Sequence, residues 1–309
     1  MSGPAAGVPT TESAHRTGGR SDHTMRFAFK TANQYRTWDD ILSVWRAADD
    51  IELFESGWLF DHFYPIWSPQ QPDPDPTEPC LEGWTMLAAL AQATRRLRMG
   101  TMVTGIHYRH PAVLANMAAT LDVVSQGRLD LGIGAGWNQQ ESGAYGIELG
   151  TLRQRFDRFD EACEVLISLL SQDVTNFDGE YYRITDARNE PKGPQRPHPP
   201  VLIGGAGEKR TLRAVARFAD MWDCSAAGND DLARKREVLK AHCQDVGRDD
   251  SEITLSSHLW LGSAEEVDRI ADTAAARAEH GVDIGIVYLA PQLGPEVLEP
   301  VADRLRPLT

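Results

Sequence analysis

The amino-acid sequence predicts a (β/α)8 barrel of the TIM type, and three observations lead to that fold class. Short segments of β character alternate with helical segments, the pattern of a parallel sheet surrounded by helices. The first β segment, RFAFKT, is followed by no glycine, whereas an open dinucleotide-binding sheet carries its glycine fingerprint there. Glycine-rich stretches instead follow the fourth and fifth segments. A doubly wound open sheet is the competing fold.

The expected strands are spread along the whole chain after Met25. They are residues 26–31, 57–61, 98–105, 128–136, 200–205, 220–225, 253–262 and 282–289. Eight strand and helix pairs are typical of a barrel of about 250 residues plus insertions. We therefore predict one barrel domain over residues 25–309.

Helix signals separate these strands. Apolar residues share one helical face after Thr37, namely Trp38, Ile41, Leu42 and Trp45. Pro111 is expected to begin another helix and Gly127 to end it. Ser263 and Glu266 have the spacing of a capping box, which predicts the start of a third.

Two segments lie outside the alternation. Residues 1–24 are small and polar and have no apolar segment of a signal peptide, so we expect a disordered tail. The connection over about 137–200 is an insertion between strands 4 and 5, with a helix over about 153–172 and a strand-like stretch at 181–185. At the C-terminal mouth of a barrel, such an insertion is expected to be a lid or an interface.

Composition excludes several classes of function. Lys and Arg number 31 against 45 Asp and Glu, a net charge of −14, which argues against nucleic acid or an anionic membrane as partners. No stretch reaches the roughly 20 apolar residues of a membrane helix. Cys80, Cys163, Cys224 and Cys243 have no metal-ligand spacing, so we expect buried thiols in a reducing cytoplasm.

The first glycine-rich stretch is LGIGAGW, residues 131–137. Its glycines, Gly132, Gly134 and Gly136, do not fit the GxGxxG spacing because Trp137 stands at the third position, and no phosphate-loop lysine follows. Bare backbone here could lie against a flat ring, or the glycines could simply fit a crowded barrel interior.

The second glycine-rich stretch, residues 204–207, joins a strand to a helix. Free N–H groups at a helix N-terminus favour an anion, and Lys209 and Arg210 add positive charge, so we predict a phosphate site. A glycine-rich turn without a ligand is the alternative.

Asp61 and His62 end the second strand, where a barrel places its active site. Adjacent residues point to opposite faces, so proton transfer or hydrogen bonding by His62 is favoured over metal binding. A histidine that only packs at the barrel rim is the alternative. No GxSxG motif, CxxC motif or metal-ligand cluster appears in the chain, which suggests that a cofactor supplies the chemistry.

Three segments together resemble one known family. GWLFDHF, the region from LEGWTMLAAL to LGIGAGWNQQE, and VLIGGAGEKRTLRAVARFADMW are similar to the luciferase-like monooxygenase superfamily, and more narrowly to its branch that uses the deazaflavin coenzyme F420. The likeness runs from Met25 to about residue 262. It implies a barrel with an insertion, usually dimeric, that holds a flavin or deazaflavin at its C-terminal mouth.

The resemblance also implies roles for individual residues. His62 would be the catalytic acid or base, and a cis peptide is expected at Met102-Val103, behind the coenzyme ring. The cofactor-binding residues would be Asp61, Met102, Val103, Thr104, Ala135, Gln140, Gly204, Gly205, Ala206 and Gly207, and the substrate pocket would include Trp67, Trp137 and Glu141. Lys209, Arg210 and Arg213 could attract the acidic tail of the deazaflavin or a flavin phosphate. No metal is implied.

One position departs from the sugar-phosphate dehydrogenases of this superfamily. They place a glutamate where this chain has Trp137, which leaves Glu141 as the nearest acid and argues against that substrate. Trp67 and Trp137 instead suggest an aromatic-walled pocket for an apolar or planar substrate, although both could equally be lid packing.

The leading interpretation is a cytoplasmic oxidoreductase that transfers a hydride between coenzyme F420 and an unidentified small organic substrate. The alternative is an FMN-dependent monooxygenase that uses reduced flavin and O2. A non-catalytic flavin- or deazaflavin-binding protein is the third hypothesis, and a metal-dependent barrel hydrolase is a distant fourth. We expect a homodimer, and a flavin or F420 reductase could be a partner.

Overall fold

The computed structural model describes residues 24–69, 72–225 and 227–309. The tail expected over residues 1–24 lies outside the described residues, except for Thr24. Among the helices described, none combines the length and the apolar character that crossing a membrane requires.

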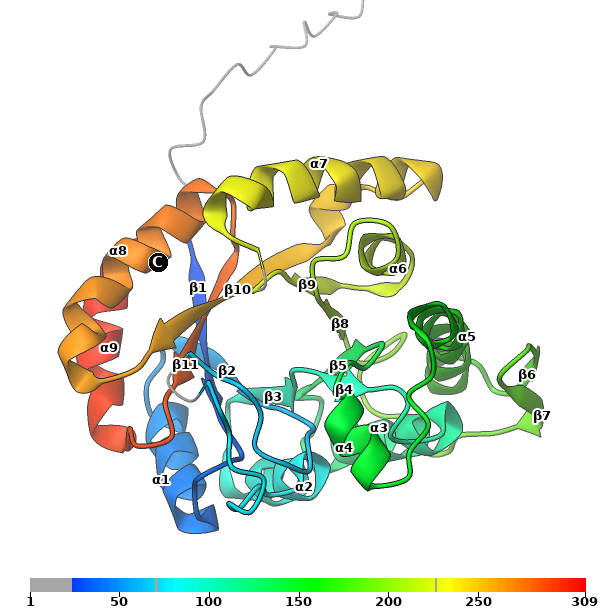
Figure 1. The fold of residues 1–309 in the computed structure, drawn as a ribbon, viewed down its shortest axis with the longest axis horizontal. Coiled ribbons are helices and arrows are strands. Elements are labelled where there is room, and N and C mark those ends of the chain that lie inside the picture. Colours follow the sequence, from blue (N-terminus) through cyan, green and yellow to red (C-terminus); the bar gives the residue numbers. More distant parts are fainter. Residues whose placement is uncertain (1–23, 70–71, 226) are drawn as a thin grey trace, which may run out of the picture.

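The main sheet is a closed parallel barrel (Figure 1). The strand order is β3-β2-β1-β11-β10-β9-β8-β5-β4, and pairing between β3 and β5 closes the ring. Because β3 and β4 are two parts of one barrel strand, the barrel has eight strands, which confirms the predicted fold. The bounds are β1 (Arg26–Thr31), β2 (Phe54–Leu59), β3 (Arg98–Thr101), β4 (Thr104–Gly105), β5 (Leu129–Gly134), β8 (Val201–Gly204), β9 (Met221–Asp223), β10 (Thr254–Leu261) and β11 (Ile284–Leu289).

Helices surround the barrel, most of them on its outside and α4 at its mouth (Figure 1). They are α1 (Trp38–Asp49), α2 (Gly83–Ala93), α3 (Pro111–Val124), α4 (Gln139–Ala144), α5 (Leu152–Ser171), α6 (Thr211–Phe218), α7 (Asn229–Asp245), α8 (Val267–Glu279) and α9 (Leu298–Leu305), with short 3-10 turns η1 (Asp250–Glu252), η2 (Ala264–Glu266), η3 (Pro295–Val297) and η4 (Arg306–Leu308). The predicted helix after Thr37 is α1, whose Ile41 and Trp45 are fully buried. Thr37 and Asp40 form a capping box at its start.

The capping box expected at Ser263 and Glu266 is wrong. The Ser263 side chain makes no cap hydrogen bond, and residues 264–266 form η2 before α8 begins at Val267. Glu266 instead accepts a hydrogen bond from the Gly262 N–H, at 2.7 Å. The short turn shifts the helix start by several residues, which a match of residue types at fixed spacing does not detect.

The strand predicted over residues 98–105 is interrupted. Met102 and Val103 separate β3 from β4, and the peptide between them is cis, which confirms the expectation from the resemblance. The Thr101 and Thr104 hydroxyls are hydrogen-bonded to each other at 2.8 Å across the interruption.

Glycines of β5 and β8 leave room for this interruption. A Cβ atom on Gly132 would lie 1.8 Å from the Thr101 carbonyl oxygen, and one on Gly134 would lie 2.8 Å from a methyl of Val103. On β8, a Cβ atom on Gly204 would lie 3.1 Å from the other methyl of Val103. Val103 therefore fills the space between the two glycine-containing strands, and the bare backbone of Gly132 and Gly134 packs against the protein itself.

The insertion between β5 and β8 contains α4, α5 and an antiparallel hairpin of β6 (Thr175–Asp178) and β7 (Arg183–Ala187). Ion pairs join α5 to α6 at Asp157–Arg210, Asp160–Arg213 and Glu164–Arg217. These pairs attach the insertion to the helix that follows β8. Its function as a lid stays a prediction.

We predict that Gly132→Ala destabilises the fold, because the new methyl would overlap the Thr101 carbonyl. Overpacking of this kind costs about 1–3 kcal/mol or more. Urea denaturation would measure the loss. Gly143→Ala is the matched control, since a Cβ atom there meets nothing within 4 Å in helix α4. Equal effects of the two substitutions would contradict the packing account.

Candidate active site

A cavity of about 160 Å³ lies at the C-terminal mouth of the barrel. Its lining residues all lie on or just after strands β1, β2, β4 and β5, or on the interruption before β4: Lys30, Phe60, His62, Ile66, Met102, Val103, Gly105, Tyr108, Gly136 and Trp137. Four of the predicted site residues, His62, Met102, Val103 and Trp137, are therefore brought together here.

His62 is held in place by Glu141. Its Nδ1 lies 2.8 Å from Glu141 Oε2, and the Glu141 side chain is completely buried. An ionised carboxylate can only accept hydrogen bonds, so Nδ1 carries a proton, and in the neutral ring the lone pair is then on Nε2. The nitrogen that remains available to a ligand in the cavity is thus Nε2.

Glu141 accepts hydrogen bonds from several donors besides His62. Oε1 accepts from the N–H groups of Phe63 and Tyr64, and Oε2 also accepts from the Tyr108 hydroxyl. Burial by itself would raise the pKa of this carboxyl, but the hydrogen bond from His62, the positive charge that this ring has when it is protonated, and the hydrogen bonds from Tyr108 and the Phe63 N–H lower it below the usual 4.5. Glu141 is therefore ionised. Glu141 was expected in the wall of the substrate pocket. It is not among the residues that line the cavity, and it contacts His62 from behind the cavity wall.

Tyr108 lines the cavity, and no role for it was predicted from the sequence. Burial raises the pKa of its hydroxyl, and the hydrogen bond and negative charge of Glu141 raise it further. The phenol therefore stays a neutral donor to Glu141. The ring of its neighbour His107 packs against it at a tilt, with ring centroids 4.0 Å apart, and burial lowers the pKa of His107 to about 4.

Asp61 has a different position from His62. Its buried carboxylate takes two hydrogen bonds from Arg109, at 2.5 and 3.1 Å, and Arg109 also bonds Glu82 at 2.6 Å. Burial raises the pKa of Asp61, and the charge and hydrogen bond of Arg109 act in the opposite direction. Asp61 does not line the cavity. It connects the strand end that carries His62 to the start of α3.

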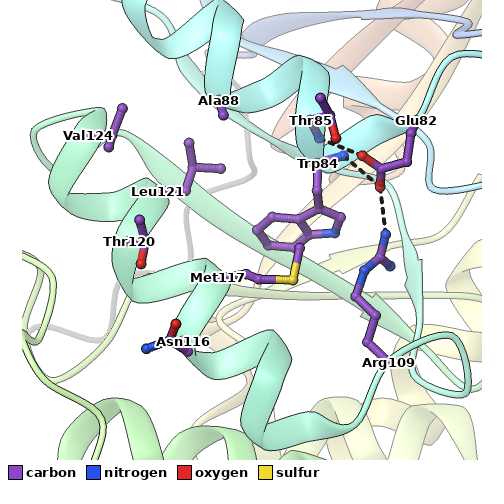
Figure 2. Close-up of a pocket in the computed structure, with 10 residues that line it drawn as sticks. All are labelled: Glu82, Trp84, Thr85, Ala88, Arg109, Asn116, Met117, Thr120, Leu121 and Val124. Carbon is purple, nitrogen blue, oxygen red and sulfur yellow. Dashed lines mark hydrogen bonds and ion pairs between the residues drawn. The ribbon is translucent and has the colours of Figure 1, made fainter.

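The Glu82–Arg109 pair also borders a groove on the outside of the barrel (Figure 2). This groove, about 540 Å³, lies between α2 and α3, and Figure 2 shows Trp84 and Met117 facing it. It is larger than the mouth cavity, but its lining contains no histidine and no cysteine. His62 makes the smaller cavity the candidate active site.

Lys30 lines the cavity and was missed by sequence reasoning. It lies on β1 among the apolar residues of RFAFKT, with 5% of its surface exposed. Its Nζ donates to the Met102 carbonyl at 3.1 Å and lies 4.6 Å from the centre of the Tyr288 ring. The only available signal was a lysine inside an otherwise buried strand.

The glycine turn after β8 is adjacent to the cavity, because Val103 contacts Gly204 from the cavity wall. The Gly205 N–H bonds the Asp223 carbonyl at 3.0 Å, and the Ala206 carbonyl accepts from Lys235, at 2.9 Å. Gly207 is exposed, and the helix α6 starts four residues later, at Thr211.

The charge around this turn differs from the expectation. Arg210 and Arg213 are committed to Asp157 and Asp160 of α5, so neither is a free cation for an anionic ligand. Lys209 is exposed. Lys235 from α7 lies close to the turn, but it is paired with Glu208 and Asp231.

Thr104, Ala135, Gln140 and Trp67 do not line the cavity, whereas Trp137 does. Thr104 is buried and accepts from the Trp84 indole at 2.9 Å. Ala135 is partly buried, Gln140 is exposed on α4, and Trp67 is 56% exposed. Trp137 is 58% exposed and meets the His62 ring edge-on, with centroids 5.4 Å apart.

Metal binding finds no support in the described part of the chain, where no group of three or more His, Cys, Asp or Glu side chains is placed to hold an ion. The four cysteines are free thiols, and all but Cys80 are buried, largely as predicted.

Comparison with known proteins identifies similar chains. The family model described as luciferase-like monooxygenase matches residues 18–291. An uncharacterised protein of Mycobacterium tuberculosis is 36% identical over 142 residues, which cover 46% of this chain and 49% of that protein, so the match spans about half of the relative's length. The F420-dependent hydroxymycolic acid dehydrogenase of the same organism is 31% identical over 246 residues, 79% of this chain and 63% of the relative.

Among solved structures, an F420-dependent secondary alcohol dehydrogenase in complex with an F420-acetone adduct superposes with a TM-score of 0.77. The match covers 90% of this chain and 99% of that chain at 18% identity. At that identity the likeness shows the fold.

We predict that Arg109→Ala lowers the free energy of unfolding by about 3–5 kcal/mol, because the Asp61 carboxylate would remain buried without its partner. The matched control is Arg95→Ala, which removes an ion pair to Asp50 from a side chain that is 84% exposed, and about 0–1 kcal/mol is expected there. Denaturant unfolding of both variants measures the difference. A loss at Arg109 no larger than at Arg95 would refute the role of this pair.

A second prediction concerns pH. The folded pKa of Glu141 lies below the usual 4.5, so its ionised form stabilises the fold above that pH, and the stabilisation is lost as the pH falls through the folded pKa. Glu141→Gln should therefore be less stable at neutral pH by about 1–3 kcal/mol, and the gap should close as the pH drops below 4.5. Unfolding curves recorded across the acid range test this. A gap that does not change with pH would show that the charge of Glu141 is unimportant.

Proposed function

The chain belongs to the luciferase-like monooxygenase family, and on this premise we propose that it is an oxidoreductase that transfers a hydride between coenzyme F420 and a small organic substrate with a hydroxyl or carbonyl group. The resemblance seen in the sequence is thereby confirmed at the level of the family, which has F420-dependent and flavin-dependent members. The substrate class and the choice of coenzyme are parts of the proposal.

One observation carries the proposal: the buried Glu141 carboxylate lies 2.8 Å from His62 Nδ1 and accepts its hydrogen bond. It leaves Nε2 with a lone pair in a cavity at the barrel mouth. A histidine in this state can accept a proton from a hydroxyl group, and its protonated form can return one to a developing alkoxide.

The residues present fit a planar coenzyme with an anionic arm. The Val103 side chain offers an apolar surface in the cavity, and Trp137 and Tyr108 supply aromatic walls. The turn from Gly204 to Gly207 adjoins Val103 and has side-chain-free backbone next to exposed Lys209. The 160 Å³ cavity is smaller than the 300–1,000 Å³ of typical ligand sites. It would hold the reacting end, while the arm would lie along the turn.

The chain's own part in the reaction is positioning and proton transfer. When bound, the deazaflavin would supply a carbon that accepts or donates the hydride. In the oxidative direction His62 Nε2 would accept the proton of the substrate hydroxyl, while the substrate carbon that bears this hydroxyl gives up its hydride to the coenzyme and becomes a carbonyl. Glu141 fixes the ring and stabilises the imidazolium that forms. In the reverse direction His62 returns the proton to the carbonyl oxygen.

The alternative of an FMN-dependent monooxygenase remains open, because the family takes its description from monooxygenases. A flavin would fit the same apolar surface and glycine turn. The third hypothesis, a coenzyme-binding protein without catalysis, predicts that His62 is dispensable. The homodimer, the reductase partner and the cytoplasmic location also stay predictions. Sedimentation velocity would test the first.

Equilibrium titration of the purified protein with F420 and with FMN tests the choice of coenzyme. We expect saturable binding of F420 with an affinity at least about tenfold higher than that for FMN, a difference of about 1.4 kcal/mol. Preferential binding of FMN would overturn the proposal in favour of the monooxygenase.

His62→Ala tests the catalytic step. With F420 and a panel of secondary alcohols, turnover should fall about 10²–10⁴-fold, the usual contribution of a positioned acid or base. The dissociation constant for F420 should change little. His280→Ala, at the end of α8 away from the barrel mouth, is the matched control and should keep full activity. Unchanged turnover in His62→Ala would refute the role of His62.

A further inference from the structure

We propose that the Lys30 ammonium binds the electron-rich edge of the reduced coenzyme ring, so that the protein binds the reduced coenzyme more tightly than the oxidised one. This inference rests on the function proposed above. It assigns a role to a cavity residue that the proton-transfer mechanism does not use.

Lys30 points into the barrel rather than outward. Side chains on a strand alternate between the two faces, and Ala28, two residues earlier on β1, belongs to the cluster inside the barrel with Trp58 and Met102. Lys30 is paired in register with Tyr288 of β11 and with Trp58 of β2. The Lys30 side chain therefore lines the same cavity as His62.

The amine has more donors than the protein uses. An ammonium group has three N–H donors. In the part of the chain that the structure describes, one acceptor oxygen, the Met102 carbonyl, lies within hydrogen-bond distance, and the Tyr288 ring face lies on another side. At least one N–H thus remains for an acceptor in the cavity. A buried cation with unused donors is costly unless a ligand completes it.

The surrounding groups keep the amine charged at neutral pH. Burial lowers the pKa of Lys30 to about 8, and the negative charge of Asp223 on β9 limits that fall. Asp223 is itself bonded by the Ser225 hydroxyl at 2.7 Å. His258 on β10 adds no charge, because burial and nearby Lys30 hold its pKa well below the usual value.

The chemistry of the coenzyme supplies a matching partner. A flavin or deazaflavin ring that accepts a hydride gains one negative charge, which stays on the ring unless a proton neutralises it. The oxidised ring lacks this added charge. A cation fixed in a cavity of low dielectric constant therefore favours the reduced form, and charges near the ring are a known means of tuning such coenzymes. Lys30 is the one lysine or arginine among the described residues that line this cavity.

The test compares dissociation constants for F420 and for its two-electron-reduced form, measured without oxygen by equilibrium titration. Lys30→Met keeps the length of the side chain and removes its charge. Lys30→Gln keeps a donor for the Met102 carbonyl without the charge, and it carries the test if the methionine variant does not fold. Lys240→Met, on the exposed surface of α7, is the matched control for the loss of one positive charge.

We expect the unaltered protein and Lys240→Met to prefer the reduced coenzyme. In both Lys30 variants this preference should fall about tenfold, while the affinity for oxidised F420 changes little. Equal weakening of both redox forms, or no change in their ratio, would overturn the role of Lys30 and leave the proposed function intact. If the unaltered protein binds neither form, the proposed function itself fails, and this inference fails with it.

Discussion

The candidate site depends on the buried carboxylate of Glu141. With no exposed surface of its own, it must be satisfied by the protein, and it takes hydrogen bonds from His62, Tyr108 and two backbone N–H groups. Those donors come from the segments after β2 and β4, while Glu141 lies on α4, at the start of the insertion. One ionised group therefore fixes three loops relative to one another. It also decides which nitrogen of His62 is free to act on a ligand.

A second constraint is the space between β5 and β8, where small residues determine what can lie at the mouth of the barrel. Gly132 and Gly134 are bare because the Thr101 carbonyl and Val103 occupy the volume that side chains would need. Val103 then lines the cavity, and the Met102 carbonyl accepts a hydrogen bond from Lys30. The glycines thus act on the site indirectly, by admitting the segment that forms the cavity wall, rather than by offering their own surface to a ring.

Much of this arrangement could be predicted from the sequence. The alternation of β and helical segments predicted the barrel, and the position of His62 directly after a strand predicted that it lies at the mouth. Both predictions succeed because they depend on local properties of the chain. The pairing of Glu141 with His62, 79 residues apart, could not be predicted from the sequence, because it depends on how α4 folds over the mouth. Lys30 was not predicted as a site residue because a lysine within RFAFKT is expected to point outward, toward solvent. Arg210 was assigned to a ligand because its partner, Asp157, lies on the insertion.

The central claim is that Glu141 holds His62 with its proton on Nδ1. Long-range ¹H–¹⁵N NMR spectra of the ligand-free protein, with the His62 signals identified from the His62→Ala variant, report directly which ring nitrogen is protonated. The account predicts that the neutral ring carries its proton on Nδ1, and that Glu141→Gln shifts it toward the mixed tautomers of free imidazole. A ring protonated on Nε2 in the unaltered protein would contradict it.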